Sequence, residues 1–543
     1  MTAPGACNIA WRLDAWAEAQ PDATAVVHRG RTMTYAELRA LCDRHAHRLA
    51  ALGIGPGTRV ALMVRPGFDF FALTFALFKL GAVPVLIDPG MGLSNMRQCL
   101  AEAAPEAFVG IPLAHLARAA GGWARATLRC RVVVGGWFPG AHRLETVPPR
   151  EEPFPRVETA PEDVAAVLFT SGSTGVPKGA VYLHRTFDAQ VAYLASQFGL
   201  GPGGVDLPTF PLFALFDVAL GATAVLPEMD FTRPGQVDPR AIVAPIQEHQ
   251  VTQMFGSPAL LDRVGRWGAD RQATLPSLRI VISAGAPVPP AVLARFQRLL
   301  GPEAVIYTPY GATEALPVAA ITAAEVLGET ASAWALGEGT CVGQPVPGLE
   351  LAVISTTDEP VSHWDDAMRL PVGAVGELVV RGPVVSPRYH GRSDHDERAK
   401  IPDGQGGVWH RMGDLGRVDE RGRVWFLGRK SHRVRAVGGE MLTIPCEAVF
   451  NQHPHVRRSA LVGVPDPERP GLERPVLCVE LEVGQPRRGS EVLRAEILAL
   501  GQAHAHTRAI ATLLFHPRFP VDIRHNAKIF REQLAIWARE QLR

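Results

Sequence analysis

The chain has 543 residues, 47% of them hydrophobic and 20% charged, which is typical of a folded protein with several domains and excludes a largely disordered chain. The 55 Lys and Arg residues almost balance the 54 Asp and Glu residues, and no basic run indicates a nucleic-acid partner. The seven cysteines are odd in number and contain no Cys-x-x-Cys pair, which argues against a disulfide framework or a zinc site and favours a reducing compartment.

No segment combines the length and the apolarity of a membrane span. The most apolar stretch, residues 207–227, is interrupted by prolines near its start and has Asp217 near its middle, where a charge is costly in lipid. We expect this stretch to form a buried wall. The first residues also lack a secretory signal, so the sequence predicts a cytoplasmic protein without a transmembrane segment. A peripheral, lipid-facing surface is left open.

Residues 34–53 predict the first long helix. Thr34 and Glu37 have the spacing of a capping box, apolar residues follow at helical intervals, and Gly53 ends the pattern.

Three apolar segments, residues 164–169, 278–283 and 304–309, predict strands that each run directly into a polar segment containing glycine. In parallel α/β sheets, ligands bind where loops leave the carboxyl ends of strands. We therefore expect the three following segments to share one pocket.

The first of these segments, SGSTGVPKGA at residues 171–180, contains three glycines, three hydroxyl side chains and Lys178. Glycines let backbone N–H groups turn inward, and these amides with hydroxyls and an ammonium form an anion site suited to a polyphosphate. The spacing differs from the Walker pattern. A flexible surface loop is the alternative.

Lysine is rare in this chain. Only five of the 55 basic residues are lysine, so each is expected to occupy a place where a compact charge is needed rather than a planar guanidinium, with chance as the alternative. They are Lys79, Lys178, Lys400, Lys430 and Lys528.

From about residue 340 the pattern changes to short strands and turns, which predicts a β-rich subdomain. After residues 428–433 a compact alternation of strands and helices predicts a separate small domain. We therefore divide the chain into residues 1–428, an α/β domain with two α/β subdomains and the β-rich subdomain, and residues 429–543, a small α+β domain.

Seven short motifs occur in an order and spacing that resemble the adenylate-forming superfamily of acyl-CoA synthetases, luciferases and peptide-synthetase adenylation domains. They are LFTSGSTGVPKGA (168–180), SAGAP (283–287), YGATE (310–314), GELVVRGP (376–383), HRMGDLGRV (410–418), GR (428–429) and NAK (526–528). The resemblance covers nearly the whole chain and implies ATP and Mg²⁺ as cofactors.

The resemblance also implies roles for individual residues. Lys178 and its loop would hold the β- and γ-phosphates, Glu314 would bind Mg²⁺, a hard cation that prefers oxygen ligands, and Asp414 would accept hydrogen bonds from the ribose. Thr313 would lie beside the α-phosphate. The other residues that would surround the nucleotide are Thr170, Ser171, Gly172, Ser173, Thr174, Gly175, Gly285, Ala286, Pro287, Tyr310, Gly311 and Arg429.

Lys528 resembles the catalytic lysine that the superfamily carries near its C-terminus. A carboxylate that attacks the α-phosphorus approaches another anion, and an ammonium between them offsets the repulsion. Because Lys528 belongs to the small domain, this domain would act as a mobile lid, with a hinge at Lys430 and Ser431. The superfamily often has Asp or Lys where Ser431 aligns, so the pivot position is left open.

The segments 209–235 and 521–532 look like the olefin-pathway β-lactone synthetases, a narrower branch. Many acyl-CoA synthetases have a His where Pro211 or Ala214 aligns here, which weakens the thioester interpretation. The branch implies adenylation of a 2-alkyl-3-hydroxy fatty acid, whose own hydroxyl then closes a β-lactone. The expected acyl pocket residues are Phe210, Phe213, Ala214 and Phe216.

The base for this hydroxyl is not identifiable; His184, His390 and His410 are candidates by chemistry alone. A long-chain acyl-CoA synthetase or acyl-AMP ligase is the runner-up, and a nucleotide-binding protein without turnover is the alternative from another class. The branch also implies work beside a thiolase-like enzyme, a reductase and a decarboxylase.

Overall fold

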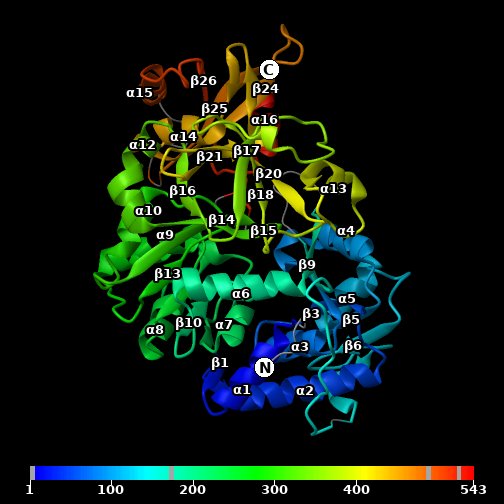
Figure 1. Cartoon of the computed structure of the whole chain (residues 1–543). Coiled ribbons are helices and arrows are strands. Elements are labelled where there is room, and N and C mark those ends of the chain that lie inside the picture. Colours follow the sequence, from blue (N-terminus) through cyan, green and yellow to red (C-terminus); the bar gives the residue numbers. More distant parts are fainter. Residues whose placement is uncertain (1–6, 149, 170–176, 483, 485–490, 523–527) are drawn as a thin grey trace.

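The computed structural model describes residues 7–148, 150–169, 177–482, 484, 491–522 and 528–543. Two large sheets, two small ones and the surrounding helices form an α/β fold (Figure 1), which confirms the predicted class. Within these residues, no helix has the length and apolarity needed to cross a bilayer.

The N-terminal sheet has seven strands in the order β7-β6-β5-β3-β4-β8-β9. Its strands pair in parallel except β9, which runs antiparallel to β8. They span β3 Arg59–Met63, β4 Val83–Leu86, β5 Ala107–Gly110, β6 Cys130–Val133, β7 His142–Arg143, β8 Val164–Phe169 and β9 Gly179–Leu183. The bounds of β8 are those predicted from the sequence.

The second sheet has fourteen strands, and its central part, β14-β13-β12-β10-β11-β1, is parallel. The parallel strands, with β2 at the edge, span β1 Thr24–His28, β2 Arg31–Thr34, β10 Val205–Pro208, β11 Thr223–Leu226, β12 Gln253–Phe255, β13 Ile280–Ile282 and β14 Val305–Ala312.

The region predicted as a β-rich subdomain continues this second sheet. β16 pairs with both β15 and β21, so antiparallel strands extend the parallel part without a break. These strands span β15 Ala315–Thr322, β16 Thr340–Pro345, β17 Glu350–Ile354, β18 Gly376–Arg381, β19 Lys400–Pro402, β20 Val408–Val418 and β21 Val424–Arg429.

Helices cover the sheets and fill the space between them. α2 begins with the predicted capping box between Thr34 and Glu37. One core cluster joins α1, α2, α3, α6 and α7 to strands of both large sheets, and α6 runs across the middle of the molecule (Figure 1). The helices of this part are α1 Ala10–Ala19, α2 Tyr35–Ala51, α3 Phe68–Lys79, α4 Leu93–Ala103, α5 Pro112–Gly121, α6 His184–Phe198, α7 Ala214–Leu220, α8 Arg240–Glu248, α9 Pro258–Arg271, α10 Pro290–Gln297, α11 Ala323–Glu325, α12 Ala331–Ala335 and α13 Ser393–Ala399.

The C-terminal part has its own apolar clusters around the sheet β24-β25-β26. The predicted strands and helices of this part are confirmed, with small differences at their ends. They span β22 Val434–Ala436, β23 Gly439–Met441, α14 Thr443–Phe450, β24 Val456–Pro465, β25 Glu473–Leu481, α15 Glu491–Gln502, β26 Thr512–Phe515 and α16 Arg531–Gln541.

Candidate active site

A cavity of about 1980 Å³ runs over the carboxyl ends of strands from both large sheets. Phe169 at the end of β8, Thr209 after β10 and Ala284 after β13 all contribute to its wall. The segments predicted after β13 and β14 line this one cavity, and so does Lys178 of the segment that follows β8, whose residues 170–176 lie outside the described part of the chain. β8 belongs to a different sheet from β13 and β14.

Asp414 on β20 is a buried carboxylate that follows the cavity-lining residues Met412 and Gly413 but does not itself line the cavity, and neither does Tyr310. Tyr310 donates a 2.6 Å hydrogen bond to its Oδ2, and the Nε of Arg429 lies 3.2 Å from its Oδ1. The Arg429 contact lacks hydrogen-bond geometry, and Oδ1 is buried with no hydrogen-bond partner among the residues described. Burial raises the pKa of Asp414, while the Arg429 guanidinium counteracts this. This oxygen is therefore suited to accept a hydrogen bond from a ligand hydroxyl.

Glu314 lies in the turn between β14 and β15. Its neighbours are an aromatic residue, Tyr389, and a cationic one, Lys178. The Tyr389 hydroxyl donates a 2.7 Å hydrogen bond to Glu314, and the Nζ of Lys178 lies 5.3 Å from the centre of the Tyr389 ring. Burial lowers the pKa of Lys178, an effect that the Glu314 charge opposes. All three residues line the cavity.

The turn that carries Thr313 and Glu314 needs a glycine at its start. A Cβ on Gly311 would lie 2.6 Å from the Ala315 carbonyl oxygen, so no side chain fits there. The Tyr182 hydroxyl donates a 2.6 Å hydrogen bond to the Thr313 carbonyl and holds the turn against β9. The backbone thus presents both predicted residues to the cavity.

Lys528 lines the same cavity, although it belongs to the C-terminal part of the chain. Its ammonium lowers the pKa of Asp414, an effect that requires proximity between the two groups. The backbone amide of Asp522 donates a 2.8 Å hydrogen bond to the Lys528 carbonyl and so ties this residue to its own domain. The structure therefore brings Lys528, Glu314 and Lys178 to one cavity.

An aromatic wall forms the apolar side of the cavity. Phe210, Phe213 and Phe216 line it, and the Phe213 ring packs edge to face on Phe210 with ring centres 5.0 Å apart. Ala214, the fourth expected pocket residue, is fully buried in the core and does not line the cavity. Helix α7 begins at this residue and turns its side chain away from the cavity.

Beneath the aromatic wall, Asp206 on β10 and Asp217 on α7 are buried close enough for each carboxyl to influence the pKa of the other. Both are buried, and burial raises the pKa of each carboxyl. A small cavity of about 80 Å³ adjoins them and shares Phe213 and Phe216 with the large one. Asp217 is therefore buried inside the protein, as predicted for the apolar stretch at residues 207–227.

Other predicted nucleotide residues have different positions. Gly285 and Gly311 line the cavity, whereas Ala286 and Pro287 do not. The residues of the phosphate loop on which the prediction depends lie outside the described residues; they are Thr170, Ser171, Gly172, Ser173, Thr174 and Gly175.

Of the three histidine candidates, only His410 lines the cavity. Its Nδ1 lies 3.2 Å from the Ala399 carbonyl, and burial holds its pKa well below the usual range. His184 is buried at the start of α6 with a pKa lowered by burial to about 4, and His390 also lies outside the cavity wall. His410 is therefore a neutral imidazole at pH 7.

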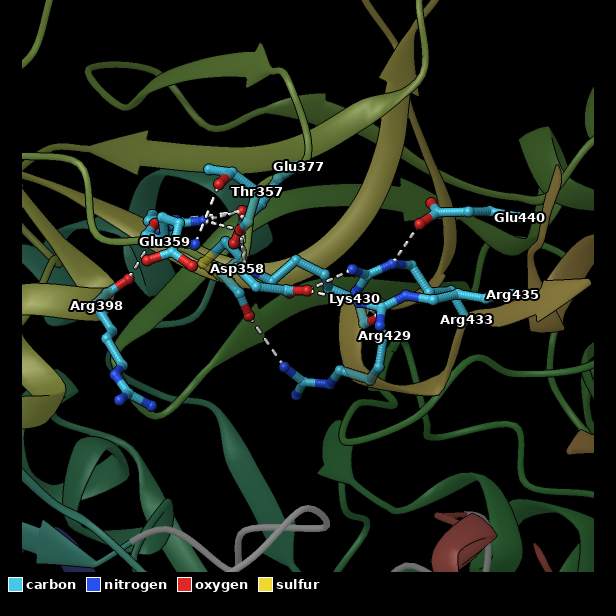
Figure 2. A network of polar contacts seen from close by, with 12 residues as sticks. Thr357, Asp358, Glu359, Glu377, Arg398, Arg429, Lys430, Arg433, Arg435 and Glu440 are labelled. Carbon is cyan, nitrogen blue, oxygen red and sulfur yellow. Dashed lines mark hydrogen bonds and ion pairs between the residues drawn. The ribbon is translucent and has the colours of Figure 1, made fainter. Parts of the chain in front are cut away.

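A network of polar contacts surrounds the predicted hinge (Figure 2). Lys430 donates hydrogen bonds of 2.8 Å to the Thr357 carbonyl and 3.0 Å to the buried carboxylate of Glu377. Arg411 forms a 2.6 Å ion pair with the same carboxylate. The ammonium of Lys430 is thus bound by residues of the large domain. The next residue, Ser431, is exposed and lines the cavity.

The second half of the network joins Asp358 to the C-terminal part of the chain (Figure 2). Arg433 and Arg435 each place a nitrogen 2.7 Å from Asp358 Oδ2, and Arg433 also contacts Glu440 at 2.7 Å. The Arg433 hydrogen bond lowers the pKa of Asp358. These pairs hold residues on either side of the predicted hinge together.

Near Glu314, sequence reasoning missed Tyr389 and named Lys400 without giving it a role. Tyr389 carried no motif signal, since only its neighbour His390 was considered. Lys400 is buried, lies 5.5 Å from the Tyr389 ring centre, and has its pKa lowered by burial to about 8. The scarcity of lysine was the signal for Lys400. Lys178, Lys430 and Lys528 line the cavity, whereas Lys79 is buried between Asp14 and Asp43.

The fold and the cavity define an enzyme of the AMP-binding class. Residues 13–390 match the family described as AMP-binding enzyme, and the chain belongs to this family.

The chain is 48% identical to the olefin beta-lactone synthetase of Xanthomonas campestris pv. campestris, with 98% of each chain covered. It is also 48% identical to the olefin beta-lactone synthetase of Stenotrophomonas maltophilia, with 99% of each covered. Among solved structures, an amide bond synthetase from Marinactinospora thermotolerans is similar, with a TM-score of 0.79, 25% identity, and coverage of 97% of this chain and 99% of the other. The predicted family is confirmed.

Proposed function

We propose that this chain uses ATP to activate a long-chain 2-alkyl-3-hydroxy fatty acid as an acyl-AMP and then closes it to a β-lactone. The observation that carries the proposal is a single cavity lined both by Lys528, Glu314 and Lys178 and by an aromatic wall. The 48% identity to two olefin beta-lactone synthetases supports the choice of product.

In the first step, a carboxylate oxygen of the acid forms a bond to the α-phosphorus of ATP, and the bond to pyrophosphate breaks. Lys528 would stand between the two anions and offset their repulsion as the charge on the phosphoryl group grows. Lys178 would neutralise the departing phosphates together with the loop at 170–175. Asp414 would accept the ribose hydroxyls through its unpaired Oδ1, with Arg429 and Tyr310 holding the carboxylate in place.

Glu314 fits a Mg²⁺ bound mainly by phosphate oxygens, because it brings one carboxylate to the cavity. Mg²⁺ commonly binds through one or two carboxylates plus substrate phosphates. When bound, the ion would supply Lewis-acid neutralisation of phosphate charge. Tyr389 keeps the Glu314 carboxylate oriented toward the cavity through its hydrogen bond.

In the second step, the substrate's 3-hydroxyl oxygen forms a bond to the acyl carbon, and the bond from that carbon to the AMP oxygen breaks. AMP leaves with the electron pair, and the hydroxyl proton passes to a base. His410 would serve, because it is neutral and lines the cavity. Nucleophile and electrophile belong to one molecule, so the cavity needs only to orient them and exclude water.

We further propose that residues 429–543 act as a lid that pivots at Lys430 and Ser431. The contacts of Lys430 with Thr357 and Glu377 support a pivot anchored in the large domain. All seven cysteines are free thiols, which suits a reducing cytoplasm. A thiolase-like enzyme, a reductase and a decarboxylase would supply the acid and consume the lactone.

The experiment that tests the function is mass spectrometry of products formed from ATP, Mg²⁺ and a racemic 2-alkyl-3-hydroxy acid. We expect AMP, pyrophosphate and an acid that has lost one water. The same acid without its 3-hydroxyl should stop at the acyl-AMP. A thioester formed on addition of CoA would instead identify an acyl-CoA synthetase, and nucleotide binding without pyrophosphate release would identify a non-catalytic protein.

A further inference from the structure

Large apolar side chains are exposed on and beside α4 and α5, at the periphery of the molecule (Figure 1). Leu93 is 68% exposed, Leu113 62%, Leu116 57% and Trp137 67%. Of the eleven large hydrophobic residues that are most exposed in the described part of the chain, these four fall within 45 consecutive positions. Clusters of this kind mark interaction surfaces more often than single exposed leucines do.

These side chains lie close together in space. Leu113 and Leu116 are separated by three positions on α5 and so share one helix face. The loop that carries Trp137 packs on the first turns of α5. A Cβ on Gly136 would lie 2.7 Å from Pro112, and the rings of Phe138 and His115 stack with centres 5.3 Å apart. We call Leu93, Leu113, Leu116 and Trp137 the apolar rim.

The apolar rim is continuous with the large cavity. Leu93 and Leu113 line the cavity and are also exposed to solvent, so the cavity reaches the surface at the rim. Behind them, Met96, Ala117 and Trp123 continue an apolar lining toward the carboxyl ends of the N-terminal sheet. Apolar side chains therefore continue from the surface into the cavity.

The segment of the chain that carries the apolar rim is basic, although the whole chain has a net charge of only +1. Residues 89–150 contain seven arginines, three glutamates and no aspartate or lysine. Two of the glutamates already form ion pairs, Glu102 with Arg392 and Glu106 with Arg59. Six of the arginines are exposed, and none of the six forms an ion pair within the described residues; they are Arg97, Arg125, Arg129, Arg131, Arg143 and Arg150.

We propose that the apolar rim and its arginines form a docking surface for an anionic lipid bilayer, and that the long-chain acid enters the cavity directly from the membrane at Leu93 and Leu113. This inference rests on the proposed function for its substrate. Leucines with an exposed tryptophan suit the boundary between headgroups and acyl chains, where an indole ring is stable. Two of the exposed arginines lie near these side chains: Arg97 follows Leu93 by one turn of α4, and Arg143 pairs with Val133 at the end of β6 that leads to Trp137. Such arginines attract anionic headgroups. A substrate with long alkyl chains resides in a bilayer rather than in water, which gives such an entrance a purpose.

The test is flotation of the full-length protein with vesicles of phosphatidylcholine alone or with one third phosphatidylglycerol. We expect the protein to float with the anionic vesicles and much less with the neutral ones. Leu116→Ser with Trp137→Ser should lower the bound fraction at least fivefold. Arg97 and Arg143 changed together to Gln should weaken the preference for anionic vesicles. The matched control is Val492→Ser with Ile536→Ser, two exposed apolar residues of the C-terminal part, which should bind like the wild type.

Two further readouts separate this inference from the proposed function. The emission of Trp137 should shift to the blue on vesicle addition, and this change should vanish in Trp137→Phe. Leu116 and Trp137 do not line the cavity, so their variant should process a dispersed short-chain 3-hydroxy acid at the wild-type rate and only the vesicle-borne long-chain acid slowly. If the dispersed acid does not react, the proposed function is refuted. The docking surface is still tested independently, because flotation requires no turnover.

Wild-type protein that stays with neither kind of vesicle would overturn the inference. Equal flotation of the wild type and the Leu116 and Trp137 variant would also overturn it. If these variants instead disrupt a complex with another protein while vesicles have no effect, the rim is a protein interface and not a lipid one.

Discussion

The Tyr389 hydroxyl donates a 2.7 Å hydrogen bond to Glu314, a residue 75 positions earlier in the chain. The ammonium groups of Lys178 and Lys400 lie 5.3 and 5.5 Å from the centre of the same ring. Tyr389 thus holds the carboxylate that we assign to Mg²⁺ and contacts two cations. This arrangement leads to the first prediction.

Tyr389→Phe should lower the rate of ATP–pyrophosphate exchange about tenfold and raise the Mg²⁺ concentration needed for half-maximal rate. A hydrogen bond to a charged group contributes about 1.5 to 3 kcal/mol, and its loss leaves Glu314 free to turn toward the lysines. The control is Tyr193→Phe, which removes a 2.7 Å hydrogen bond to the Pro347 carbonyl away from the large cavity. An unchanged Mg²⁺ dependence in Tyr389→Phe would exclude Glu314 as the metal residue.

Much of the fold follows from local sequence patterns. The capping box at Thr34, the strand at 164–169 and the glycine-containing segments after three strands concern residues close together in the chain, where periodicity and turn chemistry suffice. The scarcity of lysine likewise singled out Lys178 and Lys528 because it depends on composition alone. Both line the cavity.

The remaining features depend on contacts between distant segments. The pairing of β16 with β15 and β21, which merges the expected β-rich subdomain with the second sheet, involves a register that local alternation does not encode. Ala214 was expected to line the pocket but does not. Packing determines where α7 starts and therefore which way the Ala214 side chain points, and the local sequence does not encode this. Tyr389 reaches Glu314 across 75 positions, so no local motif reveals it.

Lys528→Ala should reduce ATP–pyrophosphate exchange by roughly 10²- to 10³-fold, the usual effect of removing one preorganised charge from a transition state. ATP affinity measured by calorimetry should change little, because the lysine acts as negative charge accumulates. Lys528→Arg is the matched variant: it keeps the charge but spreads it over a planar group, and we expect partial activity. Full exchange in Lys528→Ala would remove this residue from the mechanism.

Asp358→Asn should lower the exchange rate a few-fold by weakening the arrangement in which Lys528 lines the cavity. The substitution breaks the contacts of Asp358 with Arg433 and Arg435, and exposed ion pairs of this kind contribute less than about 1 kcal/mol each. High salt screens such pairs, so it should slow the wild type toward the variant. Asp366→Asn serves as the control, since Asp366 pairs only locally with Arg369. Faster exchange in Asp358→Asn would contradict the role of these pairs.

Asp217→Asn should stabilise the protein at pH 8 and have less effect at pH 5. Burial raises the pKa of Asp206 and Asp217 above the ordinary value of 3.8, so the folded state holds protons that the unfolded state releases. The stability that these protons contribute is complete below about pH 3.8 and is lost as pH rises through the raised pKa values. An amide at position 217 could donate a hydrogen bond to Asp206 and carries no second charge.

The measurement is the melting temperature of wild type and Asp217→Asn from pH 5 to pH 9. We expect the variant to melt about 2 to 4 °C higher than the wild type at pH 8, with the difference shrinking toward pH 5. Asp238→Asn is the control, because this exposed carboxylate pairs with Arg240, which lowers its pKa, so its substitution should bring no gain at pH 8. A melting temperature of Asp217→Asn below that of the wild type at pH 8 would show that the ionised pair stabilises the wall of the acyl pocket.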